Sequence, residues 1–222
     1  MGKIKICELY DLSHTLAESY LSAFEYPWEA LDGIKEIIKK IGETLDKELY
    51  DKTGEDIWVS KTAKVAPTAY IGGPCIIGHN TEVRHCAFIR GSALIGENCV
   101  VGNSTELKNC ILFDNVQVPH YNYVGDSILG YKSHMGAGSI TSNVKSDKTL
   151  VEIKSRDGEK LETGRKKVGA MLGDFVEIGC GSVLNPGTVI GRGSSVYPLS
   201  SVRGVIPEGM IYKSDGNTVK RV

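Results

Sequence analysis

Apolar residues recur at every sixth position through most of the chain after residue 59. A large apolar residue occupies each of these positions: Val65, Ile71, Ile77, Val83, Ile89, Ile95, Val101, Leu107 and Phe113 in a first run, and Leu172, Ile178, Leu184, Ile190, Val196 and Val202 in a second. The next residue is often glycine, and the residue two before is usually small. A period of six fits neither an α-helix nor simple strand alternation, but it fits a short strand followed by a tight corner.

Three such units of six residues, 18 in all, close one triangular coil, and successive coils stack as parallel strands. The pattern therefore predicts an all-β solenoid, a parallel β-helix, over residues 51–210. Cys75 and Cys99 fall in the small inward slot of the repeat, where packing explains them better than chemistry does. The period alone does not fix the hand of the coil, and general chirality rules favour a right-handed crossover.

The first 50 residues show no six-residue period. Thr15 and Glu18 are spaced as a capping box, and apolar residues recur at helical spacing after Pro27. We therefore predict a helical N-terminal region over residues 1–50 that caps the end or the flank of the coil. Residues 211–222 are expected to form a C-terminal tail.

A second region without the period spans residues 144–168. Two short stretches that each mix polar and apolar residues lie on either side of Asp157-Gly158. This arrangement is typical of a β-hairpin with those two residues at its tip. Because insertions in solenoids tend to project over the binding face, this inserted β-hairpin is a candidate lid or substrate arm.

The six-residue frame also slips between the two runs. After Phe113 the apolar positions are Val118, Val124, Leu129 and Met135, at steps of five, six, five and six. Departures from a consistent local rule are where functional sites are expected. We therefore predict an irregular corner at residues 119–123, from which the ring of His120 projects. Histidine titrates near neutral pH, so a projecting His120 is a candidate general base.

Two cations occupy positions that usually hold glycine. Arg90 follows Ile89 and Lys108 follows Leu107, one coil apart, so the two side chains should stack at the same edge. Like charges this close repel unless something negative lies between them. Either a carboxylate such as Glu106 neutralises them, or they bind a phosphate or carboxylate ligand.

Composition supports a globular protein with many tight corners. Glycine accounts for 26 of the 222 residues, well above the average usage of ~7%. The net charge of −1 argues against nucleic-acid binding. No apolar run approaches the ~18 residues of a membrane span, and the N-terminus lacks the apolar stretch of a signal peptide. We therefore expect a cytoplasmic protein without membrane contact, whose six scattered cysteines are reduced.

Two segments within the periodic region make a more specific match. Val118-Pro-His-Tyr-Asn-Tyr-Val-Gly-Asp126 and Met135-Gly-Ala-Gly-Ser-Ile-Thr-Ser-Asn143 resemble the acetyltransferase domain of the bifunctional N-acetylglucosamine-1-phosphate uridylyltransferase/glucosamine-1-phosphate N-acetyltransferase family. The resemblance covers residues 59–210 and implies a left-handed β-helix. The family's nucleotide-binding domain has no counterpart in these residues, so uridylyl transfer is not expected.

The resemblance implies roles for nine residues. His120 matches the catalytic base, which takes a proton from the sugar amine as that amine attacks the thioester of acetyl-CoA. The positions implied to bind the amino-sugar phosphate are Arg90, Lys108, Tyr123, Asn143 and Lys167, the last supplied across a subunit boundary. The positions implied to line the coenzyme A channel are Ala137, Cys180 and Pro198.

Family members are homotrimers with sites at subunit interfaces, so the resemblance implies the same assembly here. The implied reaction moves an acetyl group from acetyl-CoA to the amine of an amino-sugar phosphate such as glucosamine 1-phosphate, with no metal. Backbone N–H groups at residues 136–138 are expected to stabilise the thioester oxygen. His134 and Val144 stand where the family has asparagine and an aromatic residue, which leaves the acceptor sugar open.

Two other functions remain possible on the sequence alone. A γ-class carbonic anhydrase shares the fold and binds zinc through histidines, for which His79 and His85 are the candidates. The chain could instead be a non-catalytic module that binds a sugar nucleotide or a partner enzyme. The retained set of His120 with the substrate-binding residues favours the enzyme over such a module.

Overall fold

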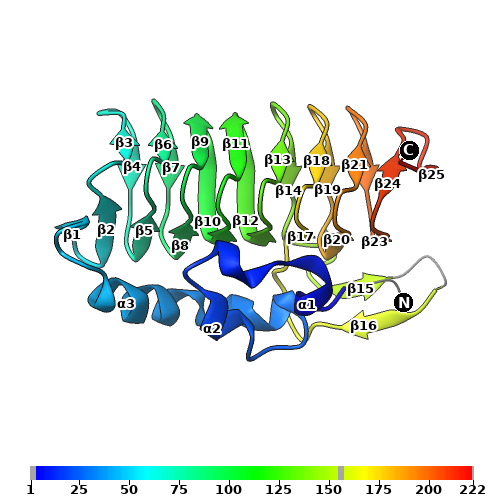
Figure 1. Ribbon diagram of the computed structural model, residues 1–222. Coiled ribbons are helices and arrows are strands. Elements are labelled where there is room, and N and C mark those ends of the chain that lie inside the picture. Colours follow the sequence, from blue (N-terminus) through cyan, green and yellow to red (C-terminus); the bar gives the residue numbers. More distant parts are fainter. Residues whose placement is uncertain (1–3, 155–157, 222) are drawn as a thin grey trace.

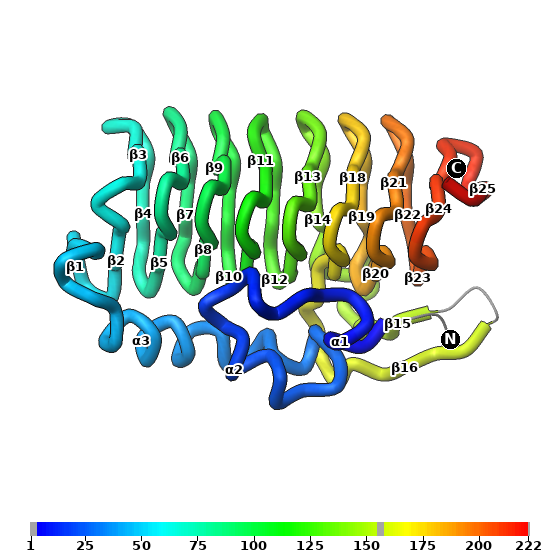
Figure 2. Tube along the Cα trace, viewed as in Figure 1, coloured from blue at the N-terminus to red at the C-terminus, as the bar shows by residue number. Residues whose placement is uncertain are grey.

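The solenoid predicted from the repeat forms an elongated prism with short helices along one side (Figure 1). The structure is a computed structural model that describes residues 4–154 and 158–221. Its parallel strands stack into a left-handed β-helix of about eight turns. The strands of each turn lie on three faces, which run along the whole prism (Figure 2).

The three faces are named here in the order in which the chain visits them. The first face contains β2 (Ile57–Ser60), β5 (Cys75–Ile77), β8 (Ala93–Ile95), the ends of β10 (Glu106–Leu112) and β12 (Tyr123–Leu129), β17 (Ala170–Leu172), β20 (Thr188–Ile190) and β23 (Val205–Ile206). The second face contains β3 (Lys64–Val65), β6 (Glu82–Val83), β9 (Val100–Asn103), β11 (Gln117–His120), β13 (His134–Met135), β18 (Glu177–Ile178), β21 (Ser195–Val196) and β24 (Met210–Tyr212). The third face contains β4 (Tyr70–Ile71), β7 (Phe88–Ile89), the starts of β10 and β12, β14 (Ile140–Thr141), β19 (Val183–Leu184) and β22 (Ser201–Val202).

The lumen is filled by the residues of the six-residue repeat. Ile77 and Ile95 lie in register, the next residue in that column is Leu112, and all three side chains are fully buried. Burial of each such side chain stabilises the fold by ~1.5–3 kcal/mol before chain entropy is counted. Cys75 and Cys99 are also buried, and burial raises the pKa of Cys99 to about 12, so its thiol stays protonated. These two cysteines therefore pack rather than react.

The N-terminal region covers the flank of the coil and not its end (Figure 1). Its elements are α1 (Ile6–Leu9), the 3-10 helix η1 (Leu12–His14), α2 (Glu18–Leu21), the 3-10 helix η2 (Pro27–Gly33) and α3 (Ile34–Thr44). On the first face Ile76, Leu94 and Ile111 alternate with the lumenal residues and so point outward, yet they are buried because this region packs over them. No helix in the described ranges is long and apolar enough to cross a membrane.

The start of α2 differs from the expected capping box. The N-cap of α2 is Ala17, which has no side chain to cap the helix, and the Thr15 hydroxyl accepts from the Ala17 N–H at 3.2 Å. The capping box predicted from Thr15 and Glu18 is therefore wrong, because the chain turns once more before the helix begins.

Asp174 fastens the N-terminal region to the coil. Its buried carboxylate accepts the backbone N–H groups of Asp11 at 2.8 Å and Tyr131 at 2.9 Å. It also pairs with the Arg192 guanidinium at 3.0 Å. Burial raises the pKa of Asp174, while these donors act in the opposite direction.

The frame slip has a different location from the predicted one. Leu107 pairs with Ile89 at a spacing of 18 residues, whereas Cys110 pairs with Ala93 at 17. The missing residue lies at the corner where β10 passes from the third face to the first. His120 pairs with Asn103 and Tyr123 pairs with Glu106, so the corner between His120 and Tyr123 has as many residues as the corner one coil earlier. The prediction of an irregular corner at residues 119–123 is therefore wrong.

The inserted hairpin lies against the coil. Strands β15 (Glu152–Lys154) and β16 (Lys160–Glu162) pair antiparallel, and the predicted tip at Asp157-Gly158 includes a residue outside the described ones. Val151 and Ile153 are fully buried, close to Gly187. The hairpin therefore extends under the last coils on the flank that the helices also cover (Figure 1), and it is not a free lid. At the ends of the prism, β1 (Tyr50–Gly54) and β25 (Thr218–Lys220) each add an antiparallel strand.

Candidate functional site

His120 and the predicted coenzyme positions lie in line along one edge of the prism. We call the edge where the second face meets the third the leading edge. There, backbone N–H groups one coil further on donate to the carbonyl oxygens of His120 at 2.9 Å, Ala137 at 2.8 Å and Cys180 at 2.9 Å. Pro198 stands at the corner that supplies the last of these donors. Four residues that the sequence links only by resemblance therefore occupy successive coils.

A buried asparagine shapes the corner that carries His120. The Asn122 Oδ1 accepts the His120 N–H at 3.1 Å, and its Nδ2 donates to the Gly136 carbonyl at 2.9 Å. Beneath this corner lies Gly102, where a Cβ would come within 1.5 Å of the Pro119 oxygen. The corner is thus fixed from both sides, while the His120 side chain is exposed at the surface.

We expect backbone N–H groups at residues 136–138 to stabilise the thioester oxygen, but most of them already have partners. The Gly136 N–H donates to the Ile178 carbonyl at 2.7 Å, and the Gly138 N–H to the His120 carbonyl at 2.9 Å. Both are used by the ladder between coils, so the assignment of these two N–H groups is wrong. Between them, the Ala137 N–H makes no backbone hydrogen bond within the described residues.

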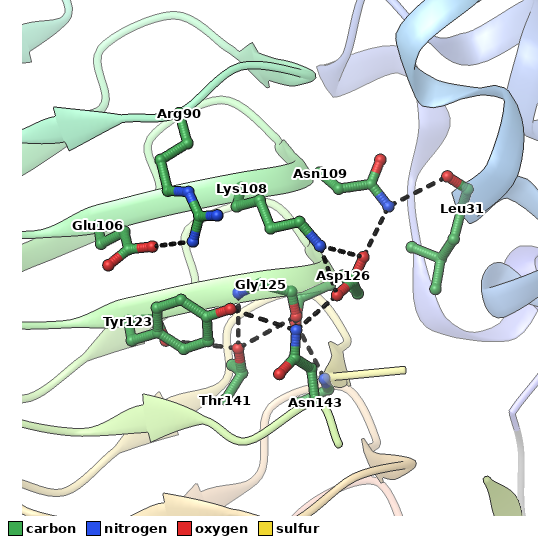
Figure 3. Close-up of polar contacts among 12 residues, drawn as sticks. Leu31, Arg90, Glu106, Lys108, Asn109, Tyr123, Gly125, Asp126, Thr141 and Asn143 are labelled. Atoms are coloured by element: carbon green, nitrogen blue, oxygen red, sulfur yellow. Dashed lines mark hydrogen bonds and ion pairs between the residues drawn. The ribbon is translucent and has the colours of Figure 1, made fainter. Parts of the chain in front are cut away.

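The two stacked cations lie at the trailing edge, where the third face meets the first (Figure 3). Arg90 donates to Glu106 at 2.7 Å, and the Lys108 Nζ lies 3.2 Å from the Asp126 carboxylate. Each cation therefore has its own carboxylate, as the first of the two sequence-based alternatives requires. The side chain of Arg90 remains 46% exposed and that of Lys108 27% exposed, so neither is fully enclosed.

Asp126 was not identified from the sequence. It follows Lys108 by 18 residues, as Lys108 follows Arg90, but the coil at this point has only 17 residues. Lys108 therefore pairs with Gly125 in the ladder, and Asp126 lies one residue further along, one coil after Asn109.

Tyr123 and Asn143 join the same cluster. The Asn143 Nδ2 donates to the Tyr123 Oη at 3.2 Å and to the Asp126 Oδ2 at 2.5 Å. Burial is the main cause that raises the pKa of Tyr123, followed by the charges of Asp126 and Glu106. The phenol is therefore protonated at neutral pH, and it can donate its hydrogen outward while it accepts from Asn143.

Lys167 lies beside this cluster in its own chain. Val144 and Lys167 form an antiparallel bridge, and the next residue, Val168, donates its N–H to the Asn143 carbonyl at 3.1 Å. The Lys167 side chain is exposed. Its expected service to a neighbouring subunit remains a prediction.

Within one chain the predicted residues form two groups. Lys108, Tyr123 and Asn143 meet through Asp126 at the trailing edge, with Arg90 paired one coil before (Figure 3). Among the described residues, no hydrogen bond or ion pair joins the ring of His120 to this cluster. His120 lies at the leading edge and Lys108, Asp126 and Asn143 at the trailing edge, with Tyr123 on the third face between them.

The histidines considered as zinc ligands have other partners. The His79 Nδ1 lies 2.6 Å from the Ser60 hydroxyl, and the His85 Nδ1 lies 2.9 Å from the Thr68 hydroxyl. The described residues contain no group of three or more His, Cys, Asp or Glu side chains that could hold a metal ion. His134, which departs from the family pattern, pairs with Glu177 at 2.9 Å on the second face.

Comparison with known proteins agrees with this architecture. The family described as GMPPB C-terminal domain matches residues 73–191, more than half of the chain. The chain belongs to this family. The part that matches the GMPPB C-terminal domain includes all the candidate site residues except Pro198.

The curated relatives of this member of the GMPPB C-terminal domain family are longer proteins. The bifunctional protein GlmU of Methanococcus aeolicus is 31% identical over 213 residues, which are 87% of this chain and 47% of the relative. The bifunctional sugar-1-phosphate nucleotidylyltransferase/acetyltransferase of Sulfurisphaera tokodaii is 30% identical over 103 residues, 46% of this chain and 25% of the relative. The chain spans less than half the length of either protein.

The solved structures that match this chain are less similar to it in sequence than these relatives. The acetyltransferase domain of PglB from Neisseria gonorrhoeae, in complex with acetyl coenzyme A, is 17% identical with a TM-score of 0.35, covering 85% of this chain and 67% of that one. The polySia specific acetyltransferase NeuO is 13% identical with a TM-score of 0.45, covering 75% and 85%.

Proposed function

We propose that the protein transfers an acetyl group from acetyl-CoA to the amine of an amino-sugar phosphate of the glucosamine 1-phosphate type. The observation that carries this proposal is the arrangement of the third face. One edge holds His120 in line with the predicted coenzyme positions, and the other holds the polar cluster of Lys108, Tyr123, Asp126 and Asn143. We place the reaction in the cytoplasm, where the sequence leads us to expect the protein.

The chemistry needs a base and an oxyanion donor. A protonated amine is no nucleophile, so the amine attacks the thioester carbon in its neutral form, and His120 takes the proton that the nitrogen gives up as the new bond forms. The negative charge that develops on the thioester oxygen requires a hydrogen-bond donor. The Ala137 N–H, which the ladder leaves unused one coil beyond His120, is our candidate. The carbon–sulfur bond then breaks, and the protonated His120 returns this proton to the departing thiolate of coenzyme A; no metal takes part.

The acceptor binds at the trailing edge. Its phosphate displaces Glu106 from the exposed Arg90 guanidinium and also reaches the Lys108 ammonium, since both cations form strong bonds to phosphate oxygens. The Tyr123 phenol and the Asn143 amide hold hydroxyl groups of the sugar. Lys167 contributes to the site of a neighbouring subunit.

We further propose that the active assembly is a homotrimer whose third faces meet. Tyr70 and Phe88 pack against each other on this face with tilted rings whose centroids are 5.4 Å apart, and both rings are exposed in the single chain. Large exposed apolar patches mark association surfaces, and in our proposal these two rings form part of such a patch. A neighbouring copy would also bring a trailing edge towards His120, which the single chain keeps apart.

The trimer predicts a mass of three 24.1 kDa chains by light scattering. Replacing Tyr70 and Phe88 together with glutamate should give smaller species, because buried like charges repel across the interface. Leu16→Glu is the matched control, since Leu16 is 43% exposed and Phe88 42%, but Leu16 lies in the N-terminal region. A wild-type monomer at all concentrations would contradict the assembly.

A thiol-release assay tests the proposed reaction. Purified protein is mixed with acetyl-CoA and each of a panel of amino-sugar 1-phosphates, and release of coenzyme A is followed. We expect turnover with at least one amine and none with the matching N-acetylated sugar, whose nitrogen is already blocked. Absence of turnover across the panel would contradict the proposal.

A non-catalytic binding module is the second candidate. The ion pairs Arg90–Glu106 and Lys108–Asp126 favour it, because they neutralise both cations without a ligand. Calorimetry separates the two functions: a module binds a sugar nucleotide or sugar phosphate, yet releases no thiol from acetyl-CoA.

A further inference from the structure

Asp126 is a charged group with very little exposed surface. Only 4% of its side chain is exposed, yet its two oxygens accept the Lys108 ammonium at 3.3 and 3.2 Å, the Asn109 amide at 2.9 Å and the Asn143 amide at 2.5 Å (Figure 3). Burial of a carboxylate is costly unless a cation and further donors satisfy it. Here the donors come from the coils before and after it, so one side chain ties three coils together.

The backbone fixes where this carboxylate points. Asp126 lies at the shortened corner with φ +50°, and its own carbonyl accepts the Gly169 N–H at 2.8 Å as the chain returns from the hairpin. Asn109 also donates to the Leu31 carbonyl at 3.2 Å, which connects the cluster to η2. The insertion and the N-terminal region therefore both hold the surroundings of Asp126 in place.

Asp126 fixes the orientation of the side chains around it. Lys108 is held towards Asp126 and away from its adjacent Glu106, which is engaged by Arg90. Asn143 must turn its Nδ2 to Asp126, and the same nitrogen reaches the Tyr123 oxygen. The phenolic hydrogen of Tyr123 is thereby left to donate to a ligand.

We infer that Asp126 is a positioning residue that aligns Lys108, Asn143 and, through Asn143, Tyr123 for the acceptor sugar phosphate. This inference rests on the proposed function and adds a residue that its chemistry does not itself require. Asp126 does not contact the reacting atoms; it acts through the groups that it orients. Its loss therefore affects the acceptor and not acetyl-CoA, which binds at the other edge.

The test is Asp126→Asn, which keeps the shape but removes the charge and turns one oxygen into a donor facing other donors. We expect kcat/KM for the amino-sugar phosphate to fall about 10- to 100-fold, the effect of losing charged hydrogen bonds. The KM for acetyl-CoA stays within about twofold of wild type. Asp174→Asn is the matched control, because it also removes a buried carboxylate but lies at the edge between the first and second faces.

The outcomes separate a positioning role from a structural one. If both variants lose stability but only Asp126→Asn loses acceptor affinity, the inference holds. Equal acceptor KM in the wild type and Asp126→Asn overturns it and leaves the proposed function standing. If Asp126→Asn fails to fold, Asn109→Ala, which removes one donor, must still raise the acceptor KM several-fold, and an unchanged value overturns the inference.

Calorimetry with glucosamine 1-phosphate distinguishes failure of the function from failure of the inference. A wild-type protein that binds this sugar phosphate without turning it over contradicts the proposed reaction. Weaker binding by Asp126→Asn in the same titration still supports the positioning role, and equal binding overturns it. A wild type that neither binds nor acetylates any amino-sugar phosphate overturns both.

Discussion

His120→Ala is expected to lower kcat for acetyl transfer by between about 100- and 10,000-fold, the usual contribution of a positioned general base. The fold should survive, because the His120 side chain is exposed and the corner is held by its backbone and by Asn122. The measurements are thiol release at saturating substrates and the melting temperature of each protein.

His85→Ala is the matched control for this variant. His85 is also exposed at the leading edge, two coils before His120, and its ring bonds only to Thr68 among the described residues. We expect normal turnover from His85→Ala. Turnover by His120→Ala at the wild-type rate would remove His120 from the role of base.

Gly102→Ala is expected to unfold or open the central coils. The new Cβ would lie 1.5 Å from the Pro119 oxygen and 1.9 Å from its carbon, so adjacent coils must separate. Overpacking of this kind costs ~1–3 kcal/mol in ordinary cores, and here the obstacle is backbone, so a loss at or above ~3 kcal/mol is expected. Chemical denaturation measures the free energy of unfolding directly.

Gly193→Ala provides the comparison. Gly193 has φ +65°, but nothing lies within 4 Å of the position of its Cβ, so only the backbone preference is lost. That penalty is ~1 kcal/mol. Equal losses for the two variants would show that close packing of the coils beneath Pro119 is not what Gly102 provides.

The repeat predicted the solenoid because one physical cause fixes both pattern and fold. Each lumenal residue must be apolar and each corner tight, and these demands recur every six residues in the sequence. That the N-terminal region covers the first face was harder to predict from the sequence. Its signal lies in runs such as Cys75-Ile76-Ile77, where the middle residue is apolar although it points away from the lumen. Such runs indicate a strand buried on both sides.

The site was predictable only in part. The spacing of Arg90 and Lys108 identified the trailing edge, but their counter-charges depended on side-chain reach. The shortened corner pairs Lys108 with Gly125, so Asp126 lies beside the ladder and can reach Asn109 as well. A count of residues does not disclose at which corner of a coil a residue is missing.

The six-residue repeat also could not predict how His120 lies relative to the acceptor site. Sequence spacing gives the coil and the face of a residue, but bringing His120 together with both cations depends on the trimer that we propose. Within one chain the width of the third face separates them. The path of the hairpin was equally hidden, because it depends on Val151 and Ile153 finding room beside Gly187.

A crystal structure with coenzyme A and glucosamine 1-phosphate tests the central claim most directly. The account predicts a trimer with coenzyme A along the leading edge past Ala137 and Cys180, its sulfur beside His120. The sugar phosphate should lie on Arg90 and Lys108, with the amine towards the same imidazole. Coenzyme bound at another edge, or a His120 remote from sulfur and amine in every copy, would contradict the account.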